Sequence, residues 1–275
     1  MNEVGKLLLQ AGKLARELGI DLADVAPTGR AISVADIRAH DTDGVRETRT
    51  RATGVRKHTA DAMTASARTI PQVTEFVTVD VTATMDLVEL LRPTITDAKL
   101  TPLTIVAKVA LAMLAERPEV NSHWDDEGQE IVTPQYVNLG IAVAAPRGLL
   151  VPVVDDAHTM SMRELCRAIA TAGERARSGH ATPAELMGGT FTITNFGVFG
   201  VDAGTPLILP GQGAILGVGS IAKRPWVIGD DVVARWVTTL ALTFDHRLID
   251  GEQASALLAG LAAMLTDPRL LLGRV

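Results

Sequence analysis

Cysteine is almost missing from this sequence of 275 residues, which contains only Cys166. One thiol excludes an internal disulfide framework and a metal site built from cysteines, and it favours a reducing, intracellular setting. Cys166 falls in a helical pattern that begins at Met162, so we interpret it as a small core residue rather than a nucleophile. No metal site is expected.

Long apolar runs are also missing. No stretch approaches the roughly 20 residues that a membrane helix needs, and the N-terminus starts polar, without the apolar block or cleavage site of a signal peptide. The net charge of −6 gives no reason to expect nucleic acid or an anionic membrane as a partner. We therefore expect a cytoplasmic protein that binds neither.

Aromatic residues make up only 3% of the chain, whereas 47% of it is hydrophobic. A large core is therefore possible, but it must be built mainly from aliphatic side chains. The length fits one large domain with a small companion, or two domains of medium size.

Residues 5–40 resemble a miniature helical unit. Gly19 ends a first helix, and Ser33 caps a second helix over 34–39, with Asp36 completing a capping box. So few apolar residues give a marginal core, which favours a docking module over an enzyme. The first helix and its end carry an apolar stripe of Leu8, Leu9, Ala15, Leu18 and Ile20.

Residues 41–54 contain almost nothing apolar, which is typical of a flexible linker. The arginines of this segment could contact phosphates or acidic partners, but a solvated linker is the interpretation that the composition favours.

Residues 55–275 form the predicted large domain. Helices and strands of mixed length in irregular order predict an α+β fold with a mixed sheet covered by helices. The apolar tail Leu270–Leu272 predicts a contact between subunits, because a free apolar tail costs solubility. Helices are expected over 57–67, 85–91, 102–114, 162–177 and 253–265, and strands over 71–81, 120–124, 130–132, 137–144, 149–154, 190–195, 214–220 and 232–243.

His246 lies where the strand over 232–243 gives way to the last helix, in a short turn bounded by Asp and Gly. A rigid scaffold can hold one imidazole at such a place. Taken alone, however, a histidine at a strand end is more often structural, and Asp250 is well placed to cap the helix. Asp245 and Arg247 could form a surface pair that contributes little.

Thr194 and Asn195 end the strand over 190–195 and precede a glycine-rich loop over 197–204. A hydroxyl and an amide at this place could donate hydrogen bonds to a developing oxyanion. The alternative is an ordinary Asx turn at a strand end.

Several motifs, in order along the chain, resemble those of one family. The stretch from Asp245 to Gly251 resembles the DHRxxDG signature of the acyltransferase core components of 2-oxo acid dehydrogenase complexes, which are related to the chloramphenicol acetyltransferases. Three further segments look like motifs of the same family, namely 147–153, 189–197 and 207–219. The resemblance covers the chain from about Val55 to its end and implies a chloramphenicol acetyltransferase-like fold.

The resemblance implies transfer of an acyl group between dihydrolipoamide and coenzyme A, with coenzyme A as substrate. It implies His246 as general base, Thr194 as oxyanion donor and Asp250 as support of the His246 turn. The site would lie between two subunits of a trimer. Trimers would build a larger core, a cube of about 24 chains rather than a dodecahedron of about 60. The implied coenzyme A contacts are Thr101, Asn195, Gly219 and Ile221.

Residues 5–40 are similar to the family's peripheral subunit-binding domain, notably over 13–22 and 28–30. The implied partners are a 2-oxo acid decarboxylating dehydrogenase, a dihydrolipoamide dehydrogenase, or both. The glycine-rich loop before Arg30 is short for this domain. No Asp-Lys-Ala site for lipoylation occurs in the sequence, so we expect the lipoyl group to come from a domain absent from this chain.

Two other functions stay open. One is a catalytically silent scaffold that assembles and docks partners; the other is a chloramphenicol-type acetyltransferase, against which the N-terminal docking unit argues. Among acyl groups, acetyl, succinyl and branched-chain acyl are possible, and we favour branched-chain acyl or acetyl. One departure from the family is Gln72, because the family often has histidine after the proline at this place.

Overall fold

The structure, a computed structural model, describes residues 3–29, 31–43, 49–146 and 148–273, with the side chains of 3–8, 42 and 43 left aside. The chain divides into two compact units, Met1–Ala52 and Thr53–Val275. In the described part of the chain, no helix is long and apolar enough to cross a membrane.

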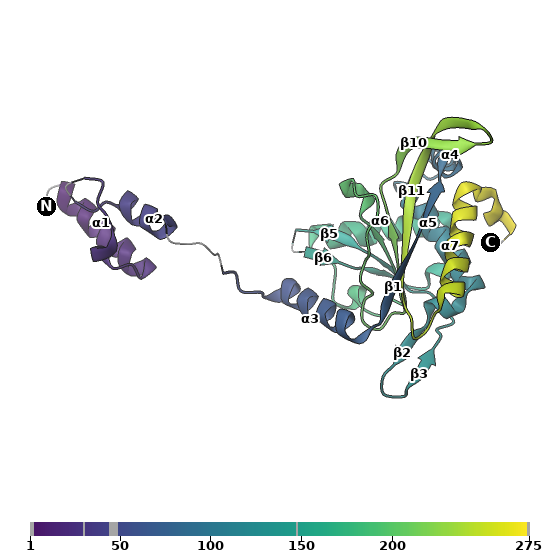
Figure 1. The fold of residues 1–275 in the computed structure, drawn as a ribbon, viewed down its shortest axis with the longest axis horizontal. Helices are drawn as coiled ribbons and strands as arrows, with labels where there is room; N and C mark the ends of the chain where they lie inside the picture. The colour runs from purple at the N-terminus through teal and green to yellow at the C-terminus, as the bar shows by residue number, and fades with distance from the viewer. Residues whose placement is uncertain (1–2, 30, 44–48, 147, 274–275) are drawn as a thin grey trace. The chain divides into compact units, whose positions relative to one another are not determined.

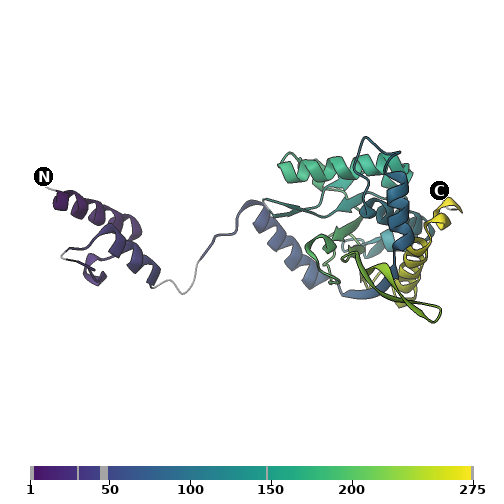
Figure 2. The same cartoon turned by 90° about the horizontal axis from the view of Figure 1, so that it is seen from above.

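The first unit consists of helix α1 (Glu3–Leu18), the short 3-10 helix η1 (Leu22–Asp24) and helix α2 (Val34–Asp43), which pack together (Figure 2). Gly19 has a φ of +70° and the Ile20 amide donates to the Ala15 carbonyl at 2.9 Å, so α1 ends as predicted. Helix α2 continues beyond its predicted end at residue 39.

The core of the first unit contains only four buried apolar side chains among the described residues: Ala11, Ala15, Val25 and Ile37. The predicted stripe is only partly correct, because Leu9 is 57% exposed and Leu18 is 42% exposed. The side chain of Leu8 lies outside the described residues. Two of the four core residues are alanines, so α1 and α2 approach closely but bury little apolar area.

Asp36 is buried in α2 and joins Thr28 to Ser33, the residue before the helix. Its carboxylate accepts hydrogen bonds from the Thr28 hydroxyl at 2.6 Å and from the Ser33 amide and hydroxyl at 2.8 and 2.7 Å. The Ser33 hydroxyl accepts from the Asp36 amide at 3.2 Å, which confirms the predicted capping box. These hydrogen bonds, first that from Thr28, hold the pKa of Asp36 well below its ordinary value.

The second unit contains one large mixed sheet in the order β1-β11-β9-β8-β4-β7, with β10 paired to β11 (Figure 1). Strand β8 is parallel to both β4 and β9, and the other neighbours are antiparallel, which confirms the predicted mixed sheet. The strands are β1 (Gln72–Asp80), β4 (Leu139–Ile141), β7 (Val153–Val154), β8 (Phe191–Asn195), β9 (Ala214–Val218), β10 (Ala222–Ile228) and β11 (Asp231–Asp245).

One face of this sheet shares a single apolar core with four helices. Alternate residues of the central strands, such as Phe191, Leu216, Leu240 and Phe244, are fully buried in this core. Helix α7 lies along β1 and β11 (Figure 1). The four helices are α4 (Thr82–Leu91), α5 (Pro102–Glu116), α6 (Met162–Ser178) and α7 (Gly251–Thr266).

The opposite face of the sheet is rich in threonine. Hydroxyls pair across β1 and β11, Thr74 with Thr243 at 2.8 Å and Thr78 with Thr239 at 3.1 Å. Thr194 follows the core residue Ile193 on β8, so strand alternation places it on this same face. Between the two threonines of β1, Phe76 is 48% exposed on the same face.

Several connecting elements differ from the prediction. The strand expected over 120–124 begins as a 3-10 helix, η2 (Pro118–Asn121), before β2 (His123–Asp125) pairs with β3 (Glu130–Val132). The strand expected over 137–144 is interrupted after β4, and β5 (Val143–Ala145) pairs instead with β6 (Gly148–Leu150). The remaining elements are α3 (Gly54–Thr69), η3 (Ala157–Thr159), η4 (Ala184–Leu186), η5 (Gly197–Phe199) and η6 (Pro268–Gly273).

The apolar tail lies in η6 and is divided between two environments. Leu271 is buried against the core, whereas Leu270 and Leu272 are 42% and 79% exposed. The tail therefore docks on its own chain through one leucine and presents the other two outward. Its predicted contact with another subunit stays a prediction.

Candidate active site

His246 directly follows β11 and begins the turn that leads to α7. Its amide donates to the Pro71 carbonyl at 3.0 Å, and its ring lies 5.8 Å from the Phe244 ring. The side chain is exposed, and no hydrogen bond to its imidazole is formed within the described part of the chain. The backbone of His246 is therefore anchored while the ring is free to meet a substrate.

Asp245 and Arg247 flank His246 and form a pair in which Asp245 is buried and Arg247 is half-buried, rather than the surface pair considered from the sequence. Asp245 is only 1% exposed and accepts from the Arg247 guanidinium at 2.7 to 3.1 Å and from the Arg247 amide at 3.0 Å. These bonds raise the pKa of Arg247. The Asp245 amide also donates to the Gly213 carbonyl at 2.8 Å, which fixes the end of β11.

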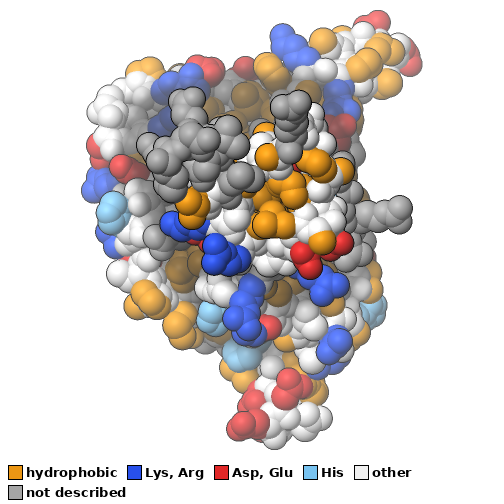
Figure 3. Space-filling view, turned by 90° about the vertical axis from the view of Figure 1, so that its left-hand side faces the viewer, with side chains coloured by type: hydrophobic (Ala, Val, Ile, Leu, Met, Phe, Trp, Pro, Cys, Tyr) orange, Lys and Arg blue, Asp and Glu red, His pale blue; other side chains and the backbone are white. Residues whose placement is uncertain are grey.

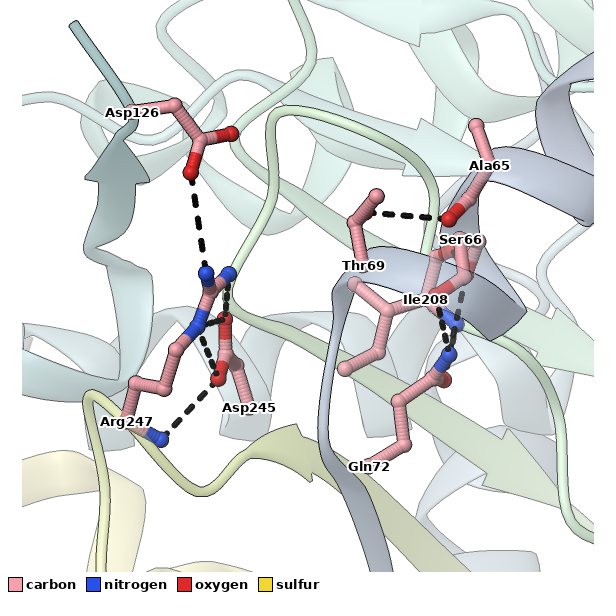
Figure 4. Close-up of polar contacts among 8 residues, drawn as sticks. All are labelled: Ala65, Ser66, Thr69, Gln72, Asp126, Ile208, Asp245 and Arg247. Atoms are coloured by element: carbon pink, nitrogen blue, oxygen red, sulfur yellow. Dashed lines mark hydrogen bonds and ion pairs between the residues drawn. The ribbon is translucent and has the colours of Figure 1, made fainter.

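The guanidinium of Arg247 also reaches the β2–β3 hairpin. It lies 5.2 Å from the centre of the Trp124 ring, a cation–π distance, and 3.7 Å from the Asp126 carboxylate (Figure 4). The tip of this hairpin gathers acidic side chains (Figure 3). The strand end, the turn of His246 and the hairpin are thus held together by one side chain.

Asp250 caps helix α7. Its carboxylate accepts from the amides of Glu252 at 3.1 Å and Gln253 at 3.5 Å, and the Gln253 side chain accepts from the Asp250 amide at 2.8 Å. The helix-cap interpretation is confirmed. No hydrogen bond between Asp250 and His246 is formed in the described part of the chain, so Asp250 fixes the far end of the His246 turn rather than the imidazole.

Thr194 and His246 of one chain are far apart. Thr194 pairs with Gly217 on β9, which in turn pairs with Ala241 on β11, five residues before His246. With strands ~4.8 Å apart and ~3.3 Å per residue, the separation is on the order of 20 Å. One chain therefore does not bring the two predicted catalytic side chains together.

Three of the four predicted coenzyme A contacts lie at the ends of the neighbouring strands β8 and β9. Asn195 pairs with Val218, and Ile221 is half-buried against the core. Gly219 has a packing reason of its own, because a Cβ there would lie 2.0 Å from the Asp202 carbonyl oxygen.

Thr101, the fourth predicted contact, precedes α5. Its hydroxyl is 3.5 Å from that of Thr104. Within the described part of the chain, no hydrogen bond joins it to the other three predicted contacts.

Gln72 was noted in the sequence only as a departure from the family, yet it lies next to the His246 turn. Gln72 is the strand partner of Asp245, and its side chain points to α3 and to the segment before β9 (Figure 4). Its amide nitrogen donates to the Ser66 hydroxyl at 2.9 Å and carbonyl at 3.2 Å, and its oxygen accepts from the Ile208 amide at 2.9 Å. Sequence pattern could not find these partners, because Ile208 is 136 residues away.

Residues 45–273 match the family of 2-oxoacid dehydrogenases acyltransferase (catalytic domain). The chain belongs to this family. The fold predicted from the motifs is the fold found in solved family members.

Two curated relatives illustrate the similarity. The chain is 45% identical over 174 residues to the dihydrolipoyllysine-residue succinyltransferase component of the mitochondrial 2-oxoglutarate dehydrogenase complex of Bos taurus, covering 63% of this chain and 38% of that protein. It is 35% identical over 277 residues to the dihydrolipoyllysine-residue acetyltransferase component of the acetoin cleaving system of Bacillus subtilis, covering 95% and 69%. The chain thus spans well under half the length of the bovine relative.

Two solved structures share the fold. One was solved to investigate the role of a serine, a histidine and an asparagine in the catalytic mechanism of the dihydrolipoamide acetyltransferase of Azotobacter vinelandii; it has 29% identity and a TM-score of 0.80, and the match covers 90% of this chain and all of that one. The other is the cubic core of a pyruvate dehydrogenase multienzyme complex, with 28% identity, a TM-score of 0.80 and the same coverage.

Proposed function

We propose that this chain is a dihydrolipoamide acyltransferase that moves an acyl group between a dihydrolipoyl thiol and coenzyme A, as the core of a 2-oxo acid dehydrogenase complex. The observation that carries this proposal is a spacing. In the Azotobacter protein the serine precedes the histidine by 52 residues and the asparagine follows it by four. Thr194, His246 and Asp250 have the same spacing here, and the His246 side chain is exposed, with no hydrogen bond to its imidazole from the described residues.

The proposed chemistry uses His246 as general base. A free thiol has a pKa of about 8.5 and is a poor nucleophile until it is deprotonated. The neutral imidazole takes the thiol proton while the sulfur attacks the thioester carbonyl, which forms a new carbon–sulfur bond. When the tetrahedral intermediate collapses, the old carbon–sulfur bond breaks and the imidazolium returns the proton to the leaving thiolate. No acyl-enzyme forms on this route.

Thr194 supplies the oxyanion donor in this scheme, and it comes from a neighbouring subunit. One well-placed donor contributes about 2.7–4 kcal/mol to an oxyanion transition state. A separation on the order of 20 Å within one chain is too long for a shared substrate carbonyl, so the scheme requires a second copy. The threonine-rich face with exposed Phe76 is where a neighbouring subunit would pack in a trimer.

The remaining roles follow the same scheme. Thr101, Asn195, Gly219 and Ile221 contact coenzyme A, and Asp250 supports the His246 turn through its helix cap. The lipoyl group comes from a domain outside the 275 residues of this sequence.

Assembly and partners belong to the proposal as well. Trimers associate through Leu270 and Leu272 into a cubic core, as the solved cubic core of a relative suggests. Residues 5–40 dock a 2-oxo acid decarboxylating dehydrogenase, a dihydrolipoamide dehydrogenase, or both. The complex works in the cytoplasm.

The test is a turnover assay of His246→Ala with free dihydrolipoamide and acetyl-, isobutyryl- or succinyl-CoA. We expect branched-chain acyl or acetyl to be transferred best, and loss of the base to lower the rate by about 10²–10⁴-fold. His180→Ala is the matched control, since His180 is also exposed and its ring bonds only the Ser178 hydroxyl within the described part of the chain.

Two results would overturn the proposal. Substantial activity in His246→Ala would exclude the base role. An inactive wild type that binds no coenzyme A but still binds a dihydrolipoamide dehydrogenase would favour the silent scaffold instead.

A further inference from the structure

We propose that Gln72 is a positioning residue for His246: its side-chain amide fixes the Pro71 carbonyl that anchors the His246 backbone. This inference rests on the proposed function and extends it to a residue that neither binds substrate nor touches the imidazole. The segments that Gln72 joins are the end of α3, the start of β1 and residues 205–211 before β9.

The side chain of Gln72 belongs to a closed hydrogen-bonded ring. Its NH₂ group donates to Ser66 and its oxygen accepts from the Ile208 amide, while the Ser66 hydroxyl donates to the Ile208 carbonyl at 2.6 Å. Ser66 and Ile208 are both fully buried. Buried polar groups that lose a partner are costly, so this ring holds its three segments in one arrangement.

The ring lies one residue from the anchor of His246. Gln72 pairs with Asp245, and the preceding residue, Pro71, accepts the hydrogen bond from the His246 amide. Proline has no N–H to donate, so this end of the β1–β11 ladder lacks the second bond that another residue could form. The side chain of Gln72 supplies the restraint that the ladder itself lacks there.

The amide side chain of Gln72 supplies both the donor and the acceptor that this ring uses. Glutamate can accept from the Ile208 amide but cannot donate to Ser66, and leucine can do neither. Without the ring, Pro71 and the His246 turn gain freedom. A displacement of 1 Å at a catalytic group can cost about 10²-fold in rate, so a partial loss of position should cost about tenfold. Substrate affinity should change little, because the proposed coenzyme A contacts lie at the end of β8, after β9 and just before α5.

The experiment compares Gln72→Leu, Gln72→Glu and Ser66→Ala with Asn138→Leu. Asn138 is the matched control: its side-chain amide also bridges two backbone segments, at the Gly188 carbonyl (3.0 Å) and the Asp156 amide (2.9 Å), but it lies beside β4, four strands from β1. We measure kcat, KM for both substrates, Tm, and the hydrogen-exchange rate of the His246 amide.

We expect Gln72→Leu to lower kcat about tenfold while KM stays within about twofold of wild type. Gln72→Glu and Ser66→Ala should lower kcat by a smaller factor. Asn138→Leu should lower Tm without changing kcat. The His246 amide should exchange faster in the Gln72 variants. An unchanged kcat and exchange rate in folded Gln72→Leu, or the same response in Asn138→Leu, would overturn the inference. If the wild type proves inactive, the proposed function fails, and the exchange rates still decide whether Gln72 holds the His246 backbone.

Discussion

Among its described residues, the first unit buries four apolar side chains and a carboxylate bonded to Thr28 and Ser33, whereas the second unit buries one continuous apolar core between a sheet and four helices. A helical pair with two alanines in its core gains little from apolar burial. The hydrogen bonds of Asp36 therefore contribute much of what holds this unit in one arrangement. The second unit has a much larger apolar core and holds His246 by its backbone at a strand end, with the side chain exposed. The first unit should therefore be sensitive to loss of a single core side chain or of the Asp36 carboxylate, whereas the second should tolerate such a loss.

The largest expected effect is Ile37→Ala in the first unit. Truncating a buried isoleucine costs about 2–5 kcal/mol, which such a small core cannot absorb, so the unit should unfold. Leu240→Ala costs a similar amount in the second unit, which should stay folded. Hydrogen exchange on the whole chain checks both: protection should vanish over 9–43 in the first variant and persist across the sheet in the second. Retained protection over 9–43 would contradict the account of a marginal core.

The next effect is on catalysis. Thr194→Val removes the proposed oxyanion donor with little change of volume, and kcat should fall by about 10²–10³-fold. Thr78→Val is the control, because Thr78 lies on the same threonine-rich face and its hydroxyl bonds Thr239. Equal losses in the two variants would indicate a general role of this face in folding or assembly instead of a donor at Thr194.

Acidification should unfold the first unit before the second. The folded-state pKa of Asp36 is depressed, so the stability that its carboxylate contributes is present above the unfolded-state pKa of about 4 and is lost as pH falls below it. The methyl NMR signals of Ile37 should therefore shift to unfolded positions on acidification before those of Leu240. In Asp36→Asn this dependence on pH should disappear. Simultaneous loss of both sets of signals would show that Asp36 does not control the first unit.

The smallest effect concerns Asp250. Asp250→Ala removes the cap of α7 and should cost about 1 kcal/mol of stability, whereas Asp250→Asn keeps a capping oxygen. We expect Asp250→Asn to retain activity within a few-fold, because the carboxylate bonds the helix amides and not the imidazole. A large loss of kcat in Asp250→Asn at unchanged Tm would assign a direct electrostatic role to the carboxylate.

Hydrophobic pattern predicted most elements of both units, because α6 and α7 bury residues three and four apart, α5 is apolar almost throughout, and β1 and β11 alternate. It missed β10, where Pro225 argues against a strand. Since β10 pairs only with β11 in the large sheet, a missing N–H is tolerated at that edge. The break after β4 was also missed, because the apolar run of 137–144 continues across it.

The candidate site was predicted as separate residues, not as an arrangement. Motifs pointed to His246, Thr194 and Asp250, but they did not show that Arg247, which bonds the buried Asp245, also lies over the ring of Trp124, more than a hundred residues earlier. Likewise, the partners of Gln72 follow from the packing of α3 against the segment before β9. Side-chain hydrogen bonds between distant segments leave no periodic signal in the chain.

The central claim is that His246 and Thr194 act together from neighbouring subunits. The most direct test coexpresses His246→Ala and Thr194→Ala chains and measures acyl transfer by the mixed assemblies. Each variant alone should be nearly inactive. In random mixtures about one quarter of the sites would pair an intact His246 with an intact Thr194, and activity should rise to about that share of wild type. If the mixture remains as inactive as the separate variants, the two residues do not form a site across the subunit interface.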